Sequence, residues 1–89
     1  MNQRKKAAAL KYEQNSDAPV VTAAGMGLIA DKIIEKAEDN DVPVVYNKEL
    51  TYLLCNVDVG DSIPPELYKA VAEILLFVYG LKAKQNGEQ

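Results

Sequence analysis

The stretch from Ala18 to Ala30, APVVTAAGMGLIA, decides the fold because it changes from strand to helix periodicity within a few residues. The β-branched run at residues 20–23 predicts a strand. The two glycines that follow predict a tight turn into a helix. From Gly25 to Asn40 the apolar residues recur at helical spacing, and we expect their buried stripe to consist of Leu28, Ile29, Ile33, Ile34 and Ala37.

Apolar runs on either side extend this unit into a small α/β domain. Residues 7–12 predict a short strand that pairs antiparallel with residues 20–23. Residues 42–46, Val-Pro-Val-Val-Tyr, predict an interior strand, and the order strand, helix, strand predicts a right-handed crossover. We therefore expect a small mixed sheet of about three strands packed with three to four helices. The predicted limits are a flexible N-terminal tail at 1–6, the domain at 7–83 and a disordered tail at 84–89.

Two further helices are predicted in the second half of the chain. Asn47 is a typical N-cap for a short helix, and Asp61 or Ser62 caps a last helix that carries Pro64-Pro65 in its first turn. The last helix has two apolar stripes at helical spacing, Leu67, Val71, Ile74, Val78 and Leu81 in the first and Tyr68, Ala72, Leu75 and Tyr79 in the second. One stripe faces the sheet, and the second is either core flank or an exposed contact surface.

Composition limits the classes of function. The 89 residues form one domain, and the net charge of −3 argues against nucleic-acid binding, which requires a basic face. The chain has no histidine and one cysteine, Cys55, so the usual general base and the common zinc sites are missing. The longest strongly apolar stretch, Ala70 to Leu81, is far shorter than the ~20 residues of a membrane span. We expect a cytoplasmic protein without its own membrane anchor, a metal site or a catalytic constellation.

The turn Gly25-Met26-Gly27-Leu28-Ile29-Ala30 matches the G-x-G-x-x-A form of a dinucleotide-binding fingerprint. Backbone amides at the start of a helix bind phosphate, which would explain such a motif. However, Tyr46-Asn47 stands at the end of the next predicted strand, where an acid would bind the ribose. We therefore expect no cofactor and interpret the glycines as residues that shape the turn, with a small nucleotide-binding domain kept as an alternative.

Five segments carry a resemblance to a known family. In order, they are Ala9-Leu10-Lys11-Tyr12, Ala18-Pro19-Val20-Val21, Gly25-Met26-Gly27-Leu28-Ile29-Ala30, Val42-Pro43-Val44-Val45, and Ile63-Pro64-Pro65-Glu66-Leu67-Tyr68-Lys69-Ala70-Val71-Ala72-Glu73. In this order and spacing they resemble the cytoplasmic C-terminal domain of the FlhB family, the substrate-specificity switches of flagellar and other type III secretion systems. The resemblance implies a stand-alone binding module of the export apparatus, peripheral to the membrane export gate.

The resemblance also implies partners and a site. The partners would be export-gate proteins and export substrates. A small apolar depression on the family's domain is implicated in recognising early export substrates, and the matching positions are Ala18, Pro19, Ala72 and Leu75. Ala72 and Leu75 also belong to the second stripe of the last helix, together with Tyr68 and Tyr79. An alternative is a regulator that competes with the full-length switch protein without supporting export.

The family's self-cleaving motif is missing. Family members carry Asn-Pro-Thr-His just before the Ala-Leu-Lys-Tyr segment and cut their own chain between the asparagine and the proline. The corresponding place here holds Asn2-Gln3-Arg4-Lys5. The proline on the leaving side and the histidine are both absent, so this chain is not expected to process itself, and we expect no enzyme activity.

We predict that the chain stays intact. Mass spectrometry after prolonged incubation at neutral pH should detect no fragment that begins at Gln3. The variant Gln3→Pro with Arg4→Thr and Lys5→His restores the family's motif and serves as the positive control. Cleavage of the parent chain before Gln3 in high yield would contradict the prediction.

Overall fold

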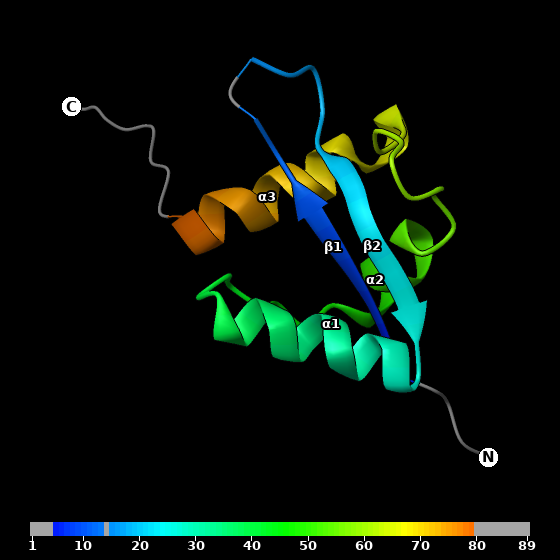
Figure 1. Ribbon diagram of the computed structural model, residues 1–89. Helices are drawn as coiled ribbons and strands as arrows, with labels where there is room; N and C mark the ends of the chain where they lie inside the picture. Colours follow the sequence, from blue (N-terminus) through cyan, green and yellow to red (C-terminus); the bar gives the residue numbers. More distant parts are fainter. Residues whose placement is uncertain (1–4, 14, 80–89) are drawn as a thin grey trace.

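The computed structural model describes residues 5–13 and 15–79 (Figure 1). Its elements are β1 (Lys6–Lys11), β2 (Val20–Met26), α1 (Leu28–Asp39), α2 (Lys48–Leu54), the 3-10 helix η1 (Pro65–Leu67) and α3 (Tyr68–Tyr79). The α/β class is confirmed: a small sheet runs through the middle of the molecule, and helices surround it. Lys6, assigned to the predicted N-terminal tail, is the first residue of β1.

The described sheet has two antiparallel strands, β1 and β2, which confirms the predicted pairing of the first two strands. The register pairs Lys6 with Met26 and Lys11 with Val20, and a bulge lies beyond Ala9. Thr22 is the extra residue on β2 at this bulge, and its hydroxyl donates to the Ala9 carbonyl at 3.3 Å. A bulge increases the local twist of the two strands.

The predicted third strand is wrong, and with it the mixed sheet and the right-handed crossover. Residues 42–46 form no strand in the described chain, and Val42 and Val45 are 48% and 37% exposed. The physical reason is the absence of a neighbour. A strand is stabilised by backbone bonds to an adjacent strand, and here a large cavity separates this segment from β1. Pro43 further removes one backbone donor.

Gly25 and Gly27 shape the turn from β2 into α1, as predicted. A Cβ atom on Gly25 would lie 2.9 Å from Cβ of Ile29 and closer still to its Cγ2, which real contacts do not tolerate. Gly27 has φ 65° and ψ −128°, a conformation that is practically restricted to glycine. The first glycine therefore permits close approach of strand and helix, and the second permits the change of direction.

The buried stripe of α1 differs from the predicted one in its first turn. Leu28 and Ile29 are 78% and 59% exposed, and Ala30 is the residue that is fully buried. Ile33, Ile34 and Ala37 are half-buried, as the helical spacing from Ala30 requires. Because β2 continues to Met26, the helix begins later than predicted, and Ala30 is the residue of its first turn that is buried.

The ends of the helices follow recognised capping patterns. α1 closes with Asp41 in the left-handed region at φ 60°, and the Val42 N–H donates to the Ala37 carbonyl at 2.8 Å. The predicted cap of α2 is confirmed, since the Asn47 side chain accepts from the Leu50 N–H at 3.0 Å. Neither Asp61 nor Ser62 caps the last helix, which instead begins from extended Pro64 through η1.

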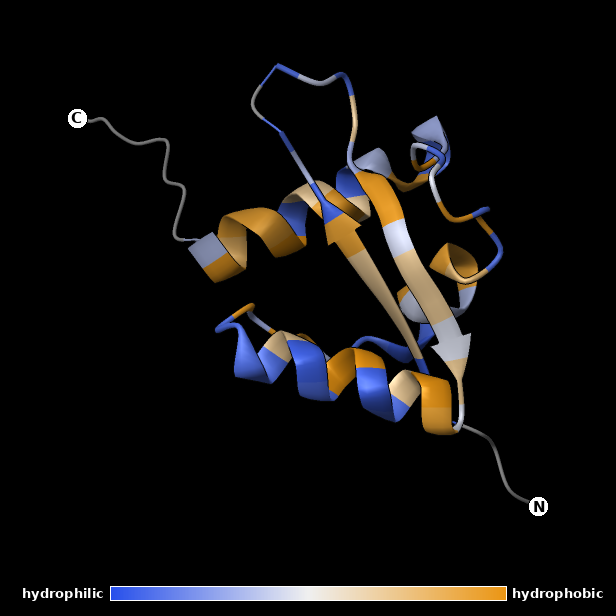
Figure 2. Cartoon of the chain, viewed as in Figure 1, coloured by the Kyte–Doolittle hydropathy of each residue, from blue (hydrophilic) through white to orange (hydrophobic). Residues whose placement is uncertain are grey.

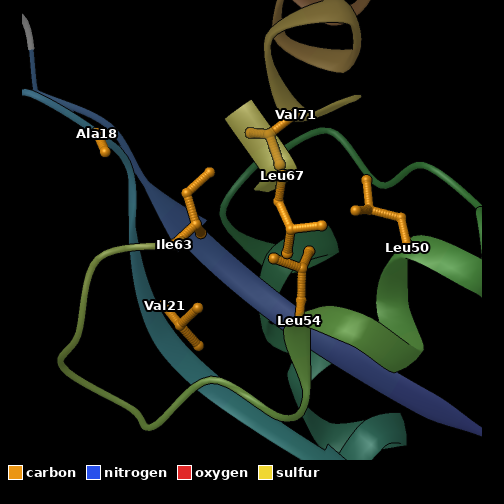
Figure 3. Packing of buried hydrophobic residues seen from close by; sticks show 7 residues of the cluster. All are labelled: Ala18, Val21, Leu50, Leu54, Ile63, Leu67 and Val71. Carbon is orange, nitrogen blue, oxygen red and sulfur yellow. The ribbon is translucent and has the colours of Figure 1, made fainter. Parts of the chain in front are cut away.

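The core lies between β2, α2 and the start of the last helix (Figure 3). Val21 is fully buried from the strand side, and Ile63 and Val71 are 2% and 1% exposed. The buried cluster consists of Ala18, Val21, Leu50, Leu54, Ile63, Leu67 and Val71. At about 1.5–3 kcal/mol for each fully buried aliphatic side chain, this cluster supplies most of the stabilisation available to so small a domain.

We predict that Gly25→Ala destabilises the protein by about 1–3 kcal/mol, because the added methyl group overpacks against Ile29. Ile29→Ala should have a small effect alone, since Ile29 is largely exposed. The double variant should recover part of the loss, because alanine at position 29 removes the closer Cγ2 contact but keeps the Cβ atom at 2.9 Å, and urea unfolding of all four proteins measures the coupling. Strictly additive losses would show that Gly25 is needed for another reason.

Candidate functional site

The four positions predicted on the last helix form a continuous stripe on α3, which we call the α3 stripe: Tyr68, Ala72, Leu75 and Tyr79. Residues three or four apart share one face of a helix, so these side chains are neighbours. Tyr68 and Tyr79 are 43% and 58% exposed, Ala72 is exposed, and Leu75 is half-buried against the core. The stripe is therefore a surface with one edge in the core.

Ala18 and Pro19 do not belong to this surface, which corrects the expected exposed patch. Ala18 is 4% exposed and Pro19 is buried. The Pro19 carbonyl accepts from the Ile63 N–H at 3.0 Å, and this bond fixes the residue 63 loop over the start of β2. Ala18 belongs to the buried cluster together with Ile63. The other predicted stripe of α3 faces the core: Val71 is buried, and Ile74 and Val78 are half-buried, while Leu81 lies outside the described residues.

Two further apolar residues of α3 are exposed, although the sequence analysis placed neither of them in an apolar stripe. Phe77 is 81% exposed and Leu76 is 45% exposed. Figure 2 shows hydrophobic residues along most of α3, whereas α1 alternates between hydrophilic and hydrophobic bands. Phe77 lies on the side of α3 opposite the α3 stripe. It follows Ala72 by five residues, which rotates its side chain by about 140° around the helix axis from Ala72. The stripe and Phe77 are thus separate surfaces of one helix.

A cavity of about 890 Å³ opens beside β1 and was not predicted from the sequence. One wall is the length of β1, and another is the extended segment Val42–Asn47. The remaining walls come from α1, α2 and the second half of α3, including Leu75 and Tyr79. Its volume falls within the range of about 300–1,000 Å³ that is typical of ligand pockets.

Positive charges stand at the end of the cavity where β1 begins. Lys5 forms an ion pair with Asp31 at 2.8 Å. The hydrogen bond to the Asp31 carboxylate, and then the negative charge of that carboxylate, raise the pKa of Lys5. The Lys6 ammonium lies 4.4 Å from the centre of the Tyr52 ring, a cation–π contact. Of the described residues that line the cavity, three are lysines, with Lys48 the third, and none is acidic.

The glycine turn lacks the geometry of a phosphate site. The Gly27 N–H already donates to the Lys5 carbonyl at 2.8 Å, so it does not point at a ligand. Asp31 in the first turn of α1 places a negative charge where a phosphate would approach. The hollow beside the turn is lined by Lys5, Met26, Gly27, Leu28, Ile29 and Asp31. This arrangement favours the structural interpretation of the two glycines.

Other chemical groups are sparse. Across residues 5–13 and 15–79, no three His, Cys, Asp or Glu side chains come together in a way that would hold a metal ion. Cys55 is half-buried, and its thiol donates a weak 3.5 Å hydrogen bond to the Ala7 carbonyl. No described helix is both long enough and apolar enough to cross a membrane. The self-cleavage positions Asn2, Gln3 and Arg4 lie outside the described residues.

Comparison with known proteins decides the family. Residues 1–78 match the FlhB HrpN YscU SpaS Family. The chain belongs to the FlhB family. It is 51% identical over 80 residues to the flagellar biosynthetic protein FlhB of Aquifex aeolicus, covering 88% of this chain and 23% of that protein. It is also 44% identical over 78 residues to YlqH of Bacillus subtilis, an uncharacterised protein, covering 86% of this chain and 84% of YlqH.

Solved structures of FlhB-family domains have the same fold. The cytoplasmic domain of FlhB from Shewanella putrefaciens matches with a TM-score of 0.80 and 32% identity over 92% of this chain and 69% of that domain. The C-terminal domain of PscU matches with a TM-score of 0.77 and 28% identity over 83% of this chain and 96% of that domain. The sequence resemblance and the fold class are thereby confirmed. The chain spans less than a quarter of the FlhB protein of Aquifex, and most of YlqH.

We predict different stability effects for two neighbouring residues of the α3 stripe. Ala72→Asp should change the free energy of unfolding by no more than about 0.5 kcal/mol, because Ala72 is exposed. Leu75→Asp should cost about 1–3 kcal/mol, because Leu75 packs against the core. Urea unfolding measures both. Equal losses in the two variants would contradict the burial boundary that runs along α3.

Proposed function

We propose that this FlhB-family chain is a non-enzymatic binding module of the flagellar or type III export apparatus, and that it acts in the cytoplasm. Its binding surface is the α3 stripe, with Ala72 at the centre and Tyr68 and Tyr79 at the ends. The partners are export-gate components or export substrates. The observation that carries the proposal is family membership over most of the chain together with an exposed apolar helix face.

The physical chemistry of the stripe supports a protein partner. Tyr68 and Tyr79 offer large rings with a polar tip, the residue type that is enriched where surfaces meet. Ala72 between them is small, so a partner side chain can approach the helix closely. Helix faces of this kind bind partner segments through apolar anchors one or two turns apart. Leu75 at the inner edge connects this surface to the core, which keeps the helix in place.

Complementation tests the proposal in a flagellated host whose FlhB lacks its cytoplasmic domain. The parent chain should restore secretion of flagellar proteins, and Ala72→Asp should reduce that secretion at least tenfold. Phe77→Asp is the matched control: it places the same charge on the opposite side of α3, at an 81% exposed position, and should retain secretion. If Ala72→Asp supports the same secretion as the parent, the α3 stripe is not the binding surface.

The same experiment separates the alternative, a competitor that occupies the partners of the full-length switch protein without supporting export. A competitor would fail to complement, and its overproduction in a wild-type host would lower secretion. Complementation without inhibition supports the module described above. The competitor hypothesis shares its surface with the first proposal, so Ala72→Asp should abolish the inhibition while Phe77→Asp leaves it intact.

A further inference from the structure

Among the described residues, the outer edge of β1 carries backbone groups that no hydrogen bond reaches. The Lys5 carbonyl accepts from Gly27 of the opposite strand, and backbone groups alternate in direction along an antiparallel strand. Lys5, Ala7 and Ala9 therefore turn their N–H and C=O groups toward β2. Lys6, Ala8 and Leu10 turn theirs outward, and among the described residues no hydrogen bond reaches these groups.

The outer edge of β2 is different because a loop covers its first half. The Val21 N–H donates to the Asp61 carbonyl at 3.0 Å, and the Gly60 N–H donates to the Val21 carbonyl at 2.7 Å. The Val20–Ser62 bridge continues this contact. Proteins commonly protect exposed strand edges in this way, since an open edge is a template for another strand. The open edge of β1 thus stands out within the same two-stranded sheet.

The cavity lies along this open edge, and its far wall has the sequence of a strand. The segment Val42-Pro43-Val44-Val45 is apolar and β-branched, and its side chains remain partly exposed. Both walls line the same 890 Å³ cavity. A segment with the composition of an interior strand thus faces an unpaired strand edge across an empty apolar space.

We propose that this cavity binds an extended segment of another protein, which adds to the free edge of β1 as a third strand. Its backbone pairs with Lys6, Ala8 and Leu10, and its second edge approaches Val42–Val45. This inference goes beyond the proposed function, because the groups that bind the segment are the outward backbone groups of β1, although Leu75 and Tyr79 of the α3 stripe also line the cavity. Six residues of β1 at ~3.3 Å each set a length of about 20 Å for the paired segment.

The cavity also defines the side chains of its occupant. Aliphatic walls from α1 and α3, among them Ile34 and Val78, require apolar residues on at least one face of the incoming strand. The lining contains lysines and no acidic residue, so a carboxylate is favoured at the end of the strand that lies near Lys6. The occupant is thus an apolar, β-branched segment of about six residues with an acidic residue at one end.

Other occupants satisfy fewer of these requirements. A helix has its backbone groups bonded internally and leaves the edge of β1 unpaired. A small apolar ligand also leaves the edge unpaired, at a cost for each dry backbone group. A second copy could offer only the free outer edge of its own β1, since its 42–46 segment contains a proline, and the sedimentation experiment below tests that occupant.

A library of random eight-residue peptides displayed on phage provides the probe. Selected peptides should alternate apolar residues and carry an acidic residue near one end. Each is then synthesised in two forms, one plain and one N-methylated at alternate amides, which keeps the side chains but removes backbone donors. The plain form should protect the Lys6, Ala8 and Leu10 amides from hydrogen exchange, and the methylated form should bind at least tenfold more weakly.

Two variants test the site from the protein side. Ala8→Pro removes one outward N–H without touching a β1–β2 bond, a change that an edge strand tolerates, and it should abolish peptide binding. Val44→Asp places a charge in the opposite wall and should weaken binding at least tenfold. Val59→Asp is its matched control, since Val59 is 58% exposed and does not line the cavity, and it should bind like the parent.

Several results would overturn the proposal. They are failure to select any peptide, equal binding by the methylated peptide, and protection confined to the outer face of α3. A dimer in sedimentation experiments that is lost on Ala8→Pro would show that a second copy fills the edge instead. Ala72 does not line the cavity, so Ala72→Asp should bind the peptide like the parent, which distinguishes this site from the exposed part of the α3 stripe around Ala72.

Discussion

The pairing of β1 with β2 is the constraint on which the rest of this fold depends. A two-stranded ribbon is at best marginally stable in water, so it must be held by what packs on it. Val21 supplies that link, because its side chain enters the core while its backbone is bonded to the loop at residues 60–61. The same residue thus joins the sheet to the hydrophobic cluster and closes one edge of the sheet. Within residues 5–13 and 15–79, no loop is bonded in this way to the outer edge of β1.

The sequence predicted those elements whose signals are local. The Asn47 cap needs only a side chain and the amide of Leu50, and the glycine turn needs only backbone freedom and the side chain of Ile29. Such short-range interactions are visible in a sequence. The second predicted stripe of α3 likewise follows from helical spacing alone, and the structure places its residues on one face.

The errors concern features that depend on distant neighbours. Helical spacing identified the apolar residues of α1 but not which side of the helix faces the core. Leu28 and Ile29, which are exposed, were therefore predicted to be buried, and the buried Ala30 was missed. Ala18 packs in one buried cluster with Ile63, and the Pro19 carbonyl is bonded to the Ile63 N–H, both across more than forty positions of sequence. Residues 42–46 have the composition of a strand, yet pairing requires a neighbour that their own sequence does not encode. The cavity was invisible for the same reason.

The second half of α3 connects these observations. Its first half is fixed by Leu67 and Val71 in the core, whereas Leu76, Phe77 and Tyr79 remain exposed. Elements with few buried apolar contacts open at low free-energy cost, so this end of the helix is the adaptable wall of the cavity. A strand added to β1 would give Val78 and Leu75 a packing surface that the isolated chain lacks. If a strand occupies the edge of β1, its apolar contacts with Leu75 and Val78 would therefore also stabilise the second half of α3.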